Sequence, residues 1–317
     1  MRWWPLPLLL VFFGSAQALA RGNSASSARI VTDDVARFWK VFDRTTPKFP
    51  AKDFDKQYLA RGSQGLKDFT KLRIGDADKL AATVRSRPRY YASVRAHTLR
   101  IRSMEGRIRS SFHALEKLYP EAVFPNVYFV IGRMSAVGTV SEHGLLLGAE
   151  MFGLTPETPF DELEDWHREA LQRFEDIPYV VAHELVHFQQ PEAPEKTTLL
   201  ASALDEGAAD FVAELISGRH LNAHLHTFGN ARERELWEEF RQKMRGEDVS
   251  GWLYETAPGR PTNLGYWMGY RIVQAYYERS TDKRAALRQI LHLRDPEAFL
   301  AASGYAERFR DRAAGEP

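Results

Sequence analysis

The fold is decided by residues 178–188, which read Pro178-Tyr179-Val180-Val181-Ala182-His183-Glu184-Leu185-Val186-His187-Phe188. The apolar spacing predicts a helix, and the stretch contains the pattern H-E-x-x-H. At about 100° per residue, His183 and His187 project within about 40° of one another, so both imidazoles can reach a single ion. An apolar stripe points away from them and consists of Ile177, Val181, Leu185 and Phe188. We therefore predict a helix with one core-facing side and one metal-facing side.

Glu184 lies between these two sides of the predicted helix. A carboxylate at that offset can contact a metal-bound water without binding the metal itself. We therefore expect Glu184 to act as the general base of a hydrolytic reaction. Because the chain has no cysteine, any further ligand of the metal must come from His, Asp or Glu.

The candidate for that ligand lies in a second acidic pattern, Leu204-Asp205-Glu206-Gly207-Ala208-Ala209-Asp210-Phe211. Glu206 follows His187 by 19 residues, and Asp210 comes one helical turn later on the same face. Alanines flank the two acids, where a solvated face would more often carry Lys, Arg or Gln. We expect Glu206 to bind the metal and Asp210 to accept the outer N–H of a ligand histidine. The alternative is that both acids face water.

Length and composition indicate a globular protein without a strong overall field. The chain has 317 residues, 44% of them hydrophobic and 27% charged, which is enough apolar surface for a core. Lys and Arg number 43 and Asp and Glu 42, so the formal net charge is +1. Such a balance gives no general attraction to nucleic acid or to an acidic membrane surface.

The N-terminus is typical of an exported protein. Residues 1–20 carry one charge and a short apolar run, and they end in Ala18-Leu19-Ala20, which predicts a cleaved signal peptide. An uncleaved membrane anchor is the alternative. We expect a flexible tether over 21–31, a single catalytic domain over 32–310 and a tail over 311–317. The mature protein is then periplasmic or extracellular, without stable membrane insertion.

The part of the chain before the sheet is predicted to be helical. Helical spacing begins behind Thr32, and a longer helix is expected from Pro88 to Tyr119. Between Arg85 and Arg109 there are eight arginines and one acid. A solvated helix face is favoured there over a surface for anionic glycans, lipid headgroups or acidic peptides.

After Pro125 the hydrophobic period changes to that of strands. Val127, Phe129 and Ile131 alternate, and residues 144–150 form a second apolar strand. Substrate backbone could add to this second strand, the alternative being an ordinary core strand. The sequence therefore predicts an α+β fold that is predominantly helical, with a small sheet next to the histidine motif.

Tyr266 and Tyr270 are candidates for a donor that stabilises the oxyanion, because a phenol stays protonated across neutral pH. Helix packing is the alternative role, since both lie in the run Gly265-Tyr266-Trp267-Met268-Gly269-Tyr270. His143 could assist substrate binding. Surface positions are favoured over a second metal site for His220, His224 and His226.

The set His183, Glu184, His187, Glu206 and Asp210 resembles the gluzincin branch of zinc metallopeptidases. In that branch the third zinc ligand is a Glu on a following helix, with an acid one turn later. The resemblance covers roughly residues 126–277. It implies a zincin-like fold, in which a helical domain lies beneath a small sheet whose edge strand holds extended peptide substrate.

A looser similarity links residues 183–190, 206–210 and 265–270 to uncharacterised predicted bacterial Zn-dependent proteases related to gliding-motility lipoprotein B. The chain lacks the cysteine of a lipoprotein, so membrane anchoring of that kind does not carry over.

These observations predict an exported zinc-dependent peptidase that holds one Zn²⁺ on His183, His187 and Glu206. Glu184 would assist attack of the zinc-bound water on a peptide carbonyl. The expected partner is a peptide or protein substrate rather than nucleic acid, and the oligomeric state is open. The alternatives are a catalytically silent binding or assembly protein on a metallopeptidase fold, and a zinc amidase acting on cell-wall peptides.

Overall fold

The computed structural model describes residues 24–191, 197–254 and 259–310. The chain divides into two compact units, which are described in turn. Of the described residues, the N-terminal unit comprises 24–188, and the C-terminal unit comprises 189–191, 197–254 and 259–310. The predicted signal peptide and C-terminal tail lie outside the described residues. A single catalytic domain over 32–310 stays a prediction.

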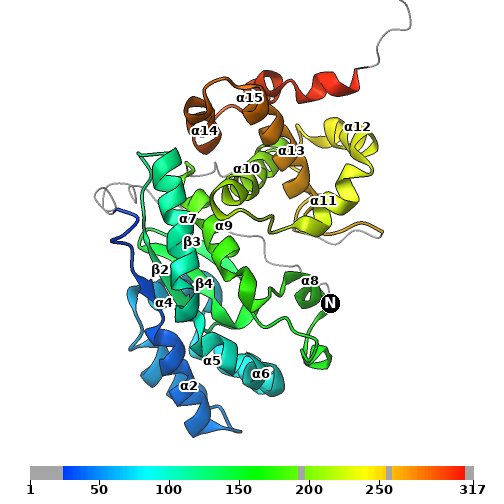
Figure 1. Cartoon of the computed structure of the whole chain (residues 1–317). Coiled ribbons are helices and arrows are strands. Elements are labelled where there is room, and N and C mark those ends of the chain that lie inside the picture. Colours follow the sequence, from blue (N-terminus) through cyan, green and yellow to red (C-terminus); the bar gives the residue numbers. More distant parts are fainter. Residues whose placement is uncertain (1–23, 192–196, 255–258, 311–317) are drawn as a thin grey trace, which may run out of the picture. The chain divides into compact units, whose positions relative to one another are not determined.

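The N-terminal unit contains a four-stranded sheet with the strand order β1-β2-β4-β3. Figure 1 labels β2, β3 and β4. Its strands are β1 (Ile30–Val31), β2 (Asn126–Val130), β3 (Gly138–Ser141) and β4 (Gly144–Gly148). β1 and β4 pair with β2 in parallel, whereas β3 pairs with β4 antiparallel. The two strands expected from the sequence, β2 and β4, are therefore present.

The expected position of the second strand at the sheet edge is wrong. β4 is hydrogen-bonded on both sides, and every one of its residues is buried. The two edges are formed instead by β1 and β3, neither of which the sequence indicated. Because β4 has no free backbone edge, an added strand could pair only with β1 or β3, and of these two β3 is the one that touches Glu184 through Gly138.

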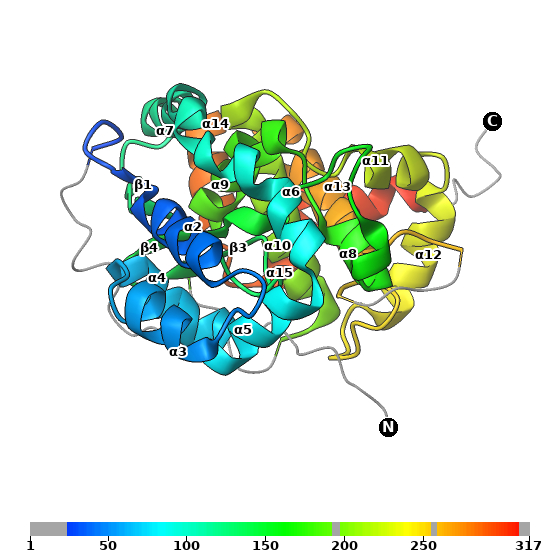
Figure 2. The same ribbon diagram turned by 90° about the horizontal axis from the view of Figure 1, so that it is seen from below.

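Helices surround this sheet and make the unit predominantly helical. They are α2 (Asp33–Thr45), α3 (Ala51–Phe54), α4 (Gln64–Phe69), α5 (Ala77–Ser86), α6 (Pro88–Leu99), α7 (Glu105–Leu118), α8 (Asp165–Ala170) and α9 (Ile177–Gln189), of which the last runs to the unit boundary. Short 3₁₀ segments are η3 (Ile101–Met104), η4 (Ala149–Met151), η5 (Phe160–Glu162) and η6 (Phe174–Asp176). Two π-helical segments are η1 (Asp55–Leu59) and η2 (Thr70–Ile74). Helices α2 and α4 contact β2 (Figure 2).

The long helix expected from Pro88 to Tyr119 is interrupted. It divides into α6 and α7 because Arg100, with φ −97° and ψ 2°, leaves helical geometry and leads into η3. The predicted apolar face is nevertheless buried along its whole length, from Ile101 to Leu115. The break changes the direction of the backbone without exposing the apolar side chains.

The flexible tether expected over 21–31 is wrong for its described part, residues 24–31. Ala25 and Ala28 are buried, and the Ala25 N–H donates to Glu116 Oε1 at 3.1 Å. The segment then enters the sheet as β1. Backbone groups of Ala25 and Ser26 hydrogen-bond to side chains of α7, so a segment of small and polar residues is ordered here.

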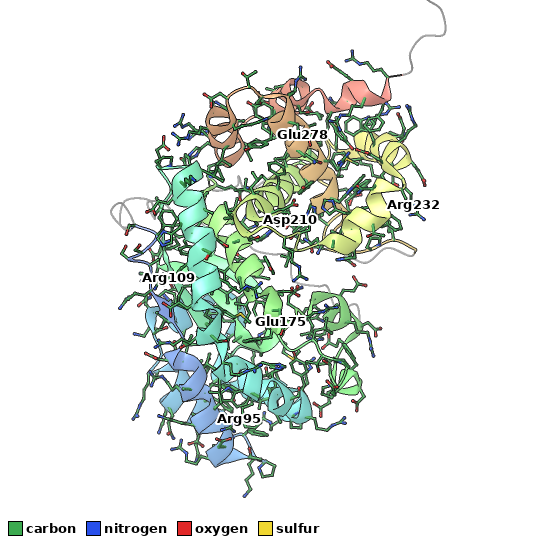
Figure 3. The ribbon with its side chains drawn as sticks, viewed as in Figure 1. Arg95, Arg109, Glu175, Asp210, Arg232 and Glu278 are labelled. Atoms are coloured by element: carbon green, nitrogen blue, oxygen red, sulfur yellow. The ribbon has the colours of Figure 1, made fainter. Side chains whose placement is uncertain are left out.

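Four of the eight arginines in the arginine-rich stretch pair with acids within the N-terminal unit. Arg95 pairs with Asp43, and Arg109 pairs with Glu105 at 2.8 Å (both arginines are labelled in Figure 3). Arg87 and Arg89 bind acids of the 161–164 segment. These ion pairs favour the interpretation of the stretch as a solvated helix face over its interpretation as a binding surface for anionic ligands.

The C-terminal unit is built from helices, among them α10 (Leu199–Ser217), α11 (Ala223–Asn230), α12 (Glu233–Lys243), α13 (Leu264–Arg279), α14 (Lys283–Leu291) and α15 (Pro296–Ser303), followed by η7 (Tyr305–Phe309). Helices α10 and α13 make its most extensive contact (Figure 1). A Cβ at Gly207 would overlap the α13 backbone, and a Cβ at Gly269 would overlap that of α10. The two glycines therefore allow the helix backbones to touch.

No helix in the described ranges is long and apolar enough to cross a membrane.

Candidate active site

Helix α9 carries the two histidines as the sequence predicted. The Nε2 atoms of His183 and His187 lie 3.0 Å apart, and the rings are almost perpendicular at 82°. On the other side of the helix, Ile177, Val181 and Leu185 are fully buried. The i, i+4 spacing therefore brings the two ring nitrogens to a common point while the apolar stripe packs into the N-terminal unit.

Glu184 is 9% exposed and lies against the sheet edge in the N-terminal unit. A Cβ on Gly138, the first residue of β3, would overlap the Glu184 carboxylate. The backbone of the edge strand thus approaches this carboxylate as closely as a glycine allows. The Glu184 carboxylate therefore lies directly against the first residue of the edge strand.

Glu206 and Asp210 lie on α10 in the C-terminal unit. Thr198 caps the start of the helix, because its side chain accepts the Ala201 N–H at 3.2 Å, and the left-handed Gly218 follows the last helical residue. Glu206 is 7% exposed and Asp210 6%, so a solvated face for the two acids is wrong. Asn222 donates to Asp210 at 2.7 Å (Asp210 is labelled in Figure 3). A hydrogen bond from a ligand histidine to Asp210 stays a prediction.

Two phenols bind Glu206 within the C-terminal unit. The Tyr254 hydroxyl donates a long hydrogen bond of 3.4 Å to Glu206 Oε1, and Tyr266 also hydrogen-bonds to this carboxylate. Burial, followed by the negative charge of Glu206, raises the pKa of both phenols above the usual value. Both tyrosines therefore remain hydrogen-bond donors throughout the neutral range.

Tyr254 was not identified from the sequence. It has the left-handed φ of 64°, which is costly for a residue with a Cβ, and its N–H donates to Asn263 Oδ1 at 2.8 Å. No helical or strand period marks this loop residue, so only its placement reveals the contact with Glu206. Tyr270, by contrast, donates to Glu214 at 2.5 Å. An oxyanion role for Tyr266 or Tyr270 stays a prediction.

Two of the other candidate histidines, His143 and His220, lie against acids inside their own units. His143 lies 2.7 Å from Asp68, which also binds the Ser141 hydroxyl. His220 and His226 are half-buried against Tyr270, while His224 is exposed. Burial lowers the pKa of His226 to about 4. Among the described residues, these three histidines join no carboxylate in a three-ligand group that could hold a metal.

His183, His187 and Glu206 supply a donor set that could hold a metal ion. The first and last are buried and His187 is half-buried. Two imidazoles and one carboxylate are the ligands of many catalytic zinc sites, which keep a further position for water or substrate.

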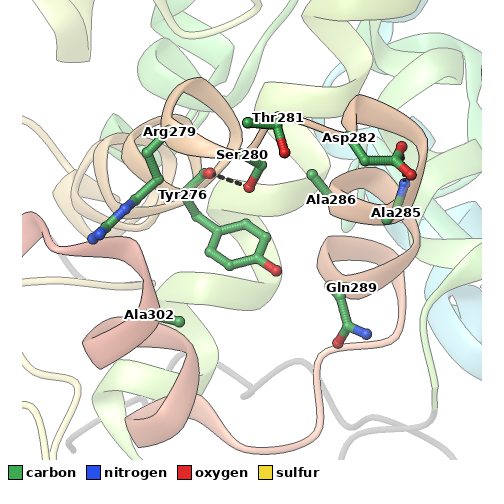
Figure 4. A pocket seen from close by; sticks show the side chains of 9 residues that line it. All are labelled: Tyr276, Arg279, Ser280, Thr281, Asp282, Ala285, Ala286, Gln289 and Ala302. Atoms are coloured by element: carbon green, nitrogen blue, oxygen red, sulfur yellow. Dashed lines mark hydrogen bonds between the residues drawn. The ribbon is translucent and has the colours of Figure 1, made fainter.

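An open cavity of about 370 Å³ lies elsewhere in the C-terminal unit, at one end of α13 (Figure 4). Its lining residues are Tyr276, Arg279, Ser280, Thr281, Asp282, Ala285, Ala286, Gln289 and Ala302. Asp282 caps α14 and Ser280 donates to the Tyr276 carbonyl at 2.7 Å. None of the residues predicted to carry chemistry lines this cavity.

Comparison with known proteins supports a zinc protease family. Residues 165–292 match the model of a family described as predicted Zn-dependent protease (DUF2268). The matched segment includes His183, Glu184, His187, Glu206, Asp210, Tyr266 and Tyr270. No curated protein and no solved structure matches the chain. The segment that carries the candidate chemistry is thus similar to a family of predicted zinc-dependent proteases.

Proposed function

We propose that the protein is a zinc-dependent peptidase of the gluzincin type, with His183, His187 and Glu206 as the zinc ligands and Glu184 as the general base. The observation that carries this proposal is the 3.0 Å separation of the two Nε2 atoms on α9. Two zinc–nitrogen bonds of about 2.0–2.1 Å at a tetrahedral angle place the nitrogens about 3.3 Å apart. The histidine pair therefore fits a single zinc ion with little adjustment.

When bound, zinc would supply a Lewis acid that acidifies a water and polarises the substrate carbonyl. Glu184 would take a proton from the attacking water and pass it to the nitrogen of the leaving amine. Its place beside Gly138 supports this role, because the carboxylate is held at the strand where a peptide backbone can pair. Tyr254 and Tyr266 would orient Glu206 through their hydroxyl groups.

The substrate is proposed to be an extended peptide that pairs with β3. This strand is only four residues long and leaves one backbone edge without a partner strand in the described sheet. Main-chain pairing provides affinity with little dependence on sequence. The zincin-like assignment rests on the helix with the histidine motif, the short antiparallel edge strand and the family match together.

Export to the periplasm or the cell exterior is proposed from residues 1–20 alone. N-terminal sequencing of the secreted protein tests this point. A new N-terminus at Arg21 would support it, and retention of Met1 in the mature protein would contradict it.

The catalytic proposal is tested with Glu184→Gln in the full chain. We expect the variant to keep one zinc per chain and to lose about 10²–10⁴-fold in turnover of a mixed peptide library, because only the proton carrier is removed. Glu169→Gln, on the exposed side of α8, makes the same chemical change away from the site and serves as control. Normal turnover by Glu184→Gln would contradict the assignment of Glu184 as the general base. If the zinc-loaded wild-type protein cleaves no peptide of the library, the alternative of a catalytically silent binding protein is favoured.

A further inference from the structure

Arg73 lies in the π-helical segment η2, which closes with the Gly75 N–H donating to the Thr70 carbonyl at 2.7 Å. π-turns are rare, and they occur frequently at functional sites. The Arg73 carbonyl accepts from Arg133 Nε at 2.9 Å and from the Ser135 hydroxyl at 3.0 Å. These bonds tie Arg73 to the loop that precedes the edge strand β3.

The Arg73 side chain reaches the edge strand itself. Its Nη2 donates to Thr139 Oγ1 at 3.0 Å, and Thr139 is the residue after Gly138, which touches Glu184. Burial lowers the pKa of the Arg73 guanidinium, and the Glu184 carboxylate counteracts that shift. A cation is therefore held at the edge strand, one residue along the chain from the glycine that touches Glu184.

This guanidinium is incompletely satisfied. Its Nε is buried without an acceptor, and no carboxylate of the described residues forms a direct ion pair with it. The side chain as a whole is half-buried, but enclosing one N–H of a charged group without an acceptor is costly. A brace for β3 would need only the neutral hydrogen bond to Thr139, so bracing does not account for the charge. The planar fork of a guanidinium is suited to bind a carboxylate through two hydrogen bonds.

We propose that Arg73 binds a carboxylate of the peptide substrate beside β3, and so selects peptides that carry such a group near the bond to be cleaved. The carboxylate comes either from the C-terminus or from an acidic side chain. This inference rests on the proposed peptidase function and adds a substrate class to it.

Binding is measured by calorimetry on the zinc-loaded full chain carrying Glu184→Gln, which prevents turnover. Three mixed-sequence N-acetylated peptide pools serve as probes: one with a free C-terminus, one with a C-terminal amide and a Glu, and one with the amide and Gln in place of Glu. At least one carboxylate pool is expected to bind about 10- to 100-fold tighter than the neutral pool. The pool with this advantage identifies the source of the carboxylate.

The same measurement on added Arg73 variants separates recognition from bracing. Arg73→Gln is expected to abolish the advantage of carboxylates, and Arg73→Lys to retain part of it. The matched control is Arg133→Gln, which removes a bond from the same loop and is expected to keep the advantage. Urea unfolding of each variant verifies that the chain is folded.

Equal binding of the three pools, no binding of any pool, or an advantage that persists in Arg73→Gln would each overturn the inference. Turnover by the chain with Glu184 intact distinguishes this result from failure of the peptidase proposal. A chain that binds carboxylates through Arg73 but cleaves nothing contradicts only the peptidase activity. A chain that cleaves neutral and acidic peptides alike contradicts only the role of Arg73.

Discussion

Glu150 is a completely buried carboxyl group that lies outside the catalytic proposal. Its two oxygens accept the N–H groups of Gly132 and Met134 at 2.8 and 3.0 Å. Burial raises its pKa from 4.5 to about 7, against the lowering effect of these hydrogen bonds. The group holds the loop that leads to β3, so its charge state affects the stability of the sheet edge.

This pKa predicts a pH-dependent stability that Glu150→Gln removes. Between about pH 4.5 and 7 the folded state keeps a proton that the unfolded state has lost, so the free energy of unfolding contributed by Glu150 falls as pH rises. The expected fall is at most about 3 kcal/mol. Urea unfolding of both zinc-free proteins at pH 5 and pH 8 measures it as the change in their stability difference. A difference that does not change with pH would contradict the prediction.

The two candidate tyrosines of α13 are expected to differ in their effect on the metal. Tyr266 hydrogen-bonds to Glu206, whereas Tyr270 donates to Glu214. Tyr266→Phe should therefore weaken zinc binding about 10- to 100-fold, because it releases an oriented ligand. Tyr270→Phe makes the same chemical change and should leave zinc affinity unaltered. Competition with a chelating dye measures both, and equal affinities would refute the orienting role of Tyr266.

At the residue scale, the sequence predicts those positions whose relation is fixed within one helix. His183 and His187 share a face of α9, and Glu206 and Asp210 share a buried face of α10, because four residues make about one turn. Tyr254 and Arg73 escape such prediction, since a loop and a π-turn place them and neither has a regular period. In the sequence, nothing distinguishes Arg73 from the many other arginines.

At the element scale, β3 is the strand on which the proposed chemistry depends. Its first residue, Gly138, leaves no room for a side chain next to Glu184. The atoms that an added methyl group would meet belong to a flexible side chain rather than to backbone. Displacement of the Glu184 carboxylate is therefore less costly than displacement of the strand.

Gly138→Ala is accordingly expected to reduce turnover at least about tenfold with one zinc still bound, because the general base is moved from its position. The unfolding free energy should change by about 1 kcal/mol or less, since only a flexible side chain must move. Gly106→Ala is the control, because a Cβ at this α7 position meets nothing within 4 Å. Full activity of Gly138→Ala would contradict the role assigned to this strand.

The elements predicted from the sequence are the long apolar ones. β2 and β4 have clear apolar patterns, whereas β3 consists of Gly138-Thr139-Val140-Ser141 and has no such pattern. The edge was therefore assigned to the wrong strand. The break at Arg100 was missed for a similar reason, because the apolar face continues through η3 and shows no interruption in the sequence.

At the scale of the whole molecule, the family match and the proposed site cover different parts of the chain. The match includes α9, α10 and α13, but it begins after the four strands and after η2. Gly138 and Arg73 thus lie outside the matched segment. Zinc chemistry follows from the matched part, while substrate selection is proposed from the part that precedes it.

The overall charge balance of the chain agrees with the proposal that a local site, Arg73, selects the peptide substrate. The formal net charge is +1, and the pairs of Arg95 and Arg109 with acids show how much of the positive charge is compensated locally. Without a broad electrostatic field, an incompletely paired cation such as Arg73 has a larger influence on which peptide binds.

The central claim is that His183, His187 and Glu206 bind one zinc ion. X-ray diffraction at the zinc absorption edge, from crystals of the zinc-loaded full chain, tests it most directly. One anomalous peak per chain is expected, about 2.0–2.1 Å from both Nε2 atoms and about 2.0–2.2 Å from a Glu206 carboxylate oxygen. A peak at other residues, or a Glu206 side chain that does not contact the ion, would contradict it.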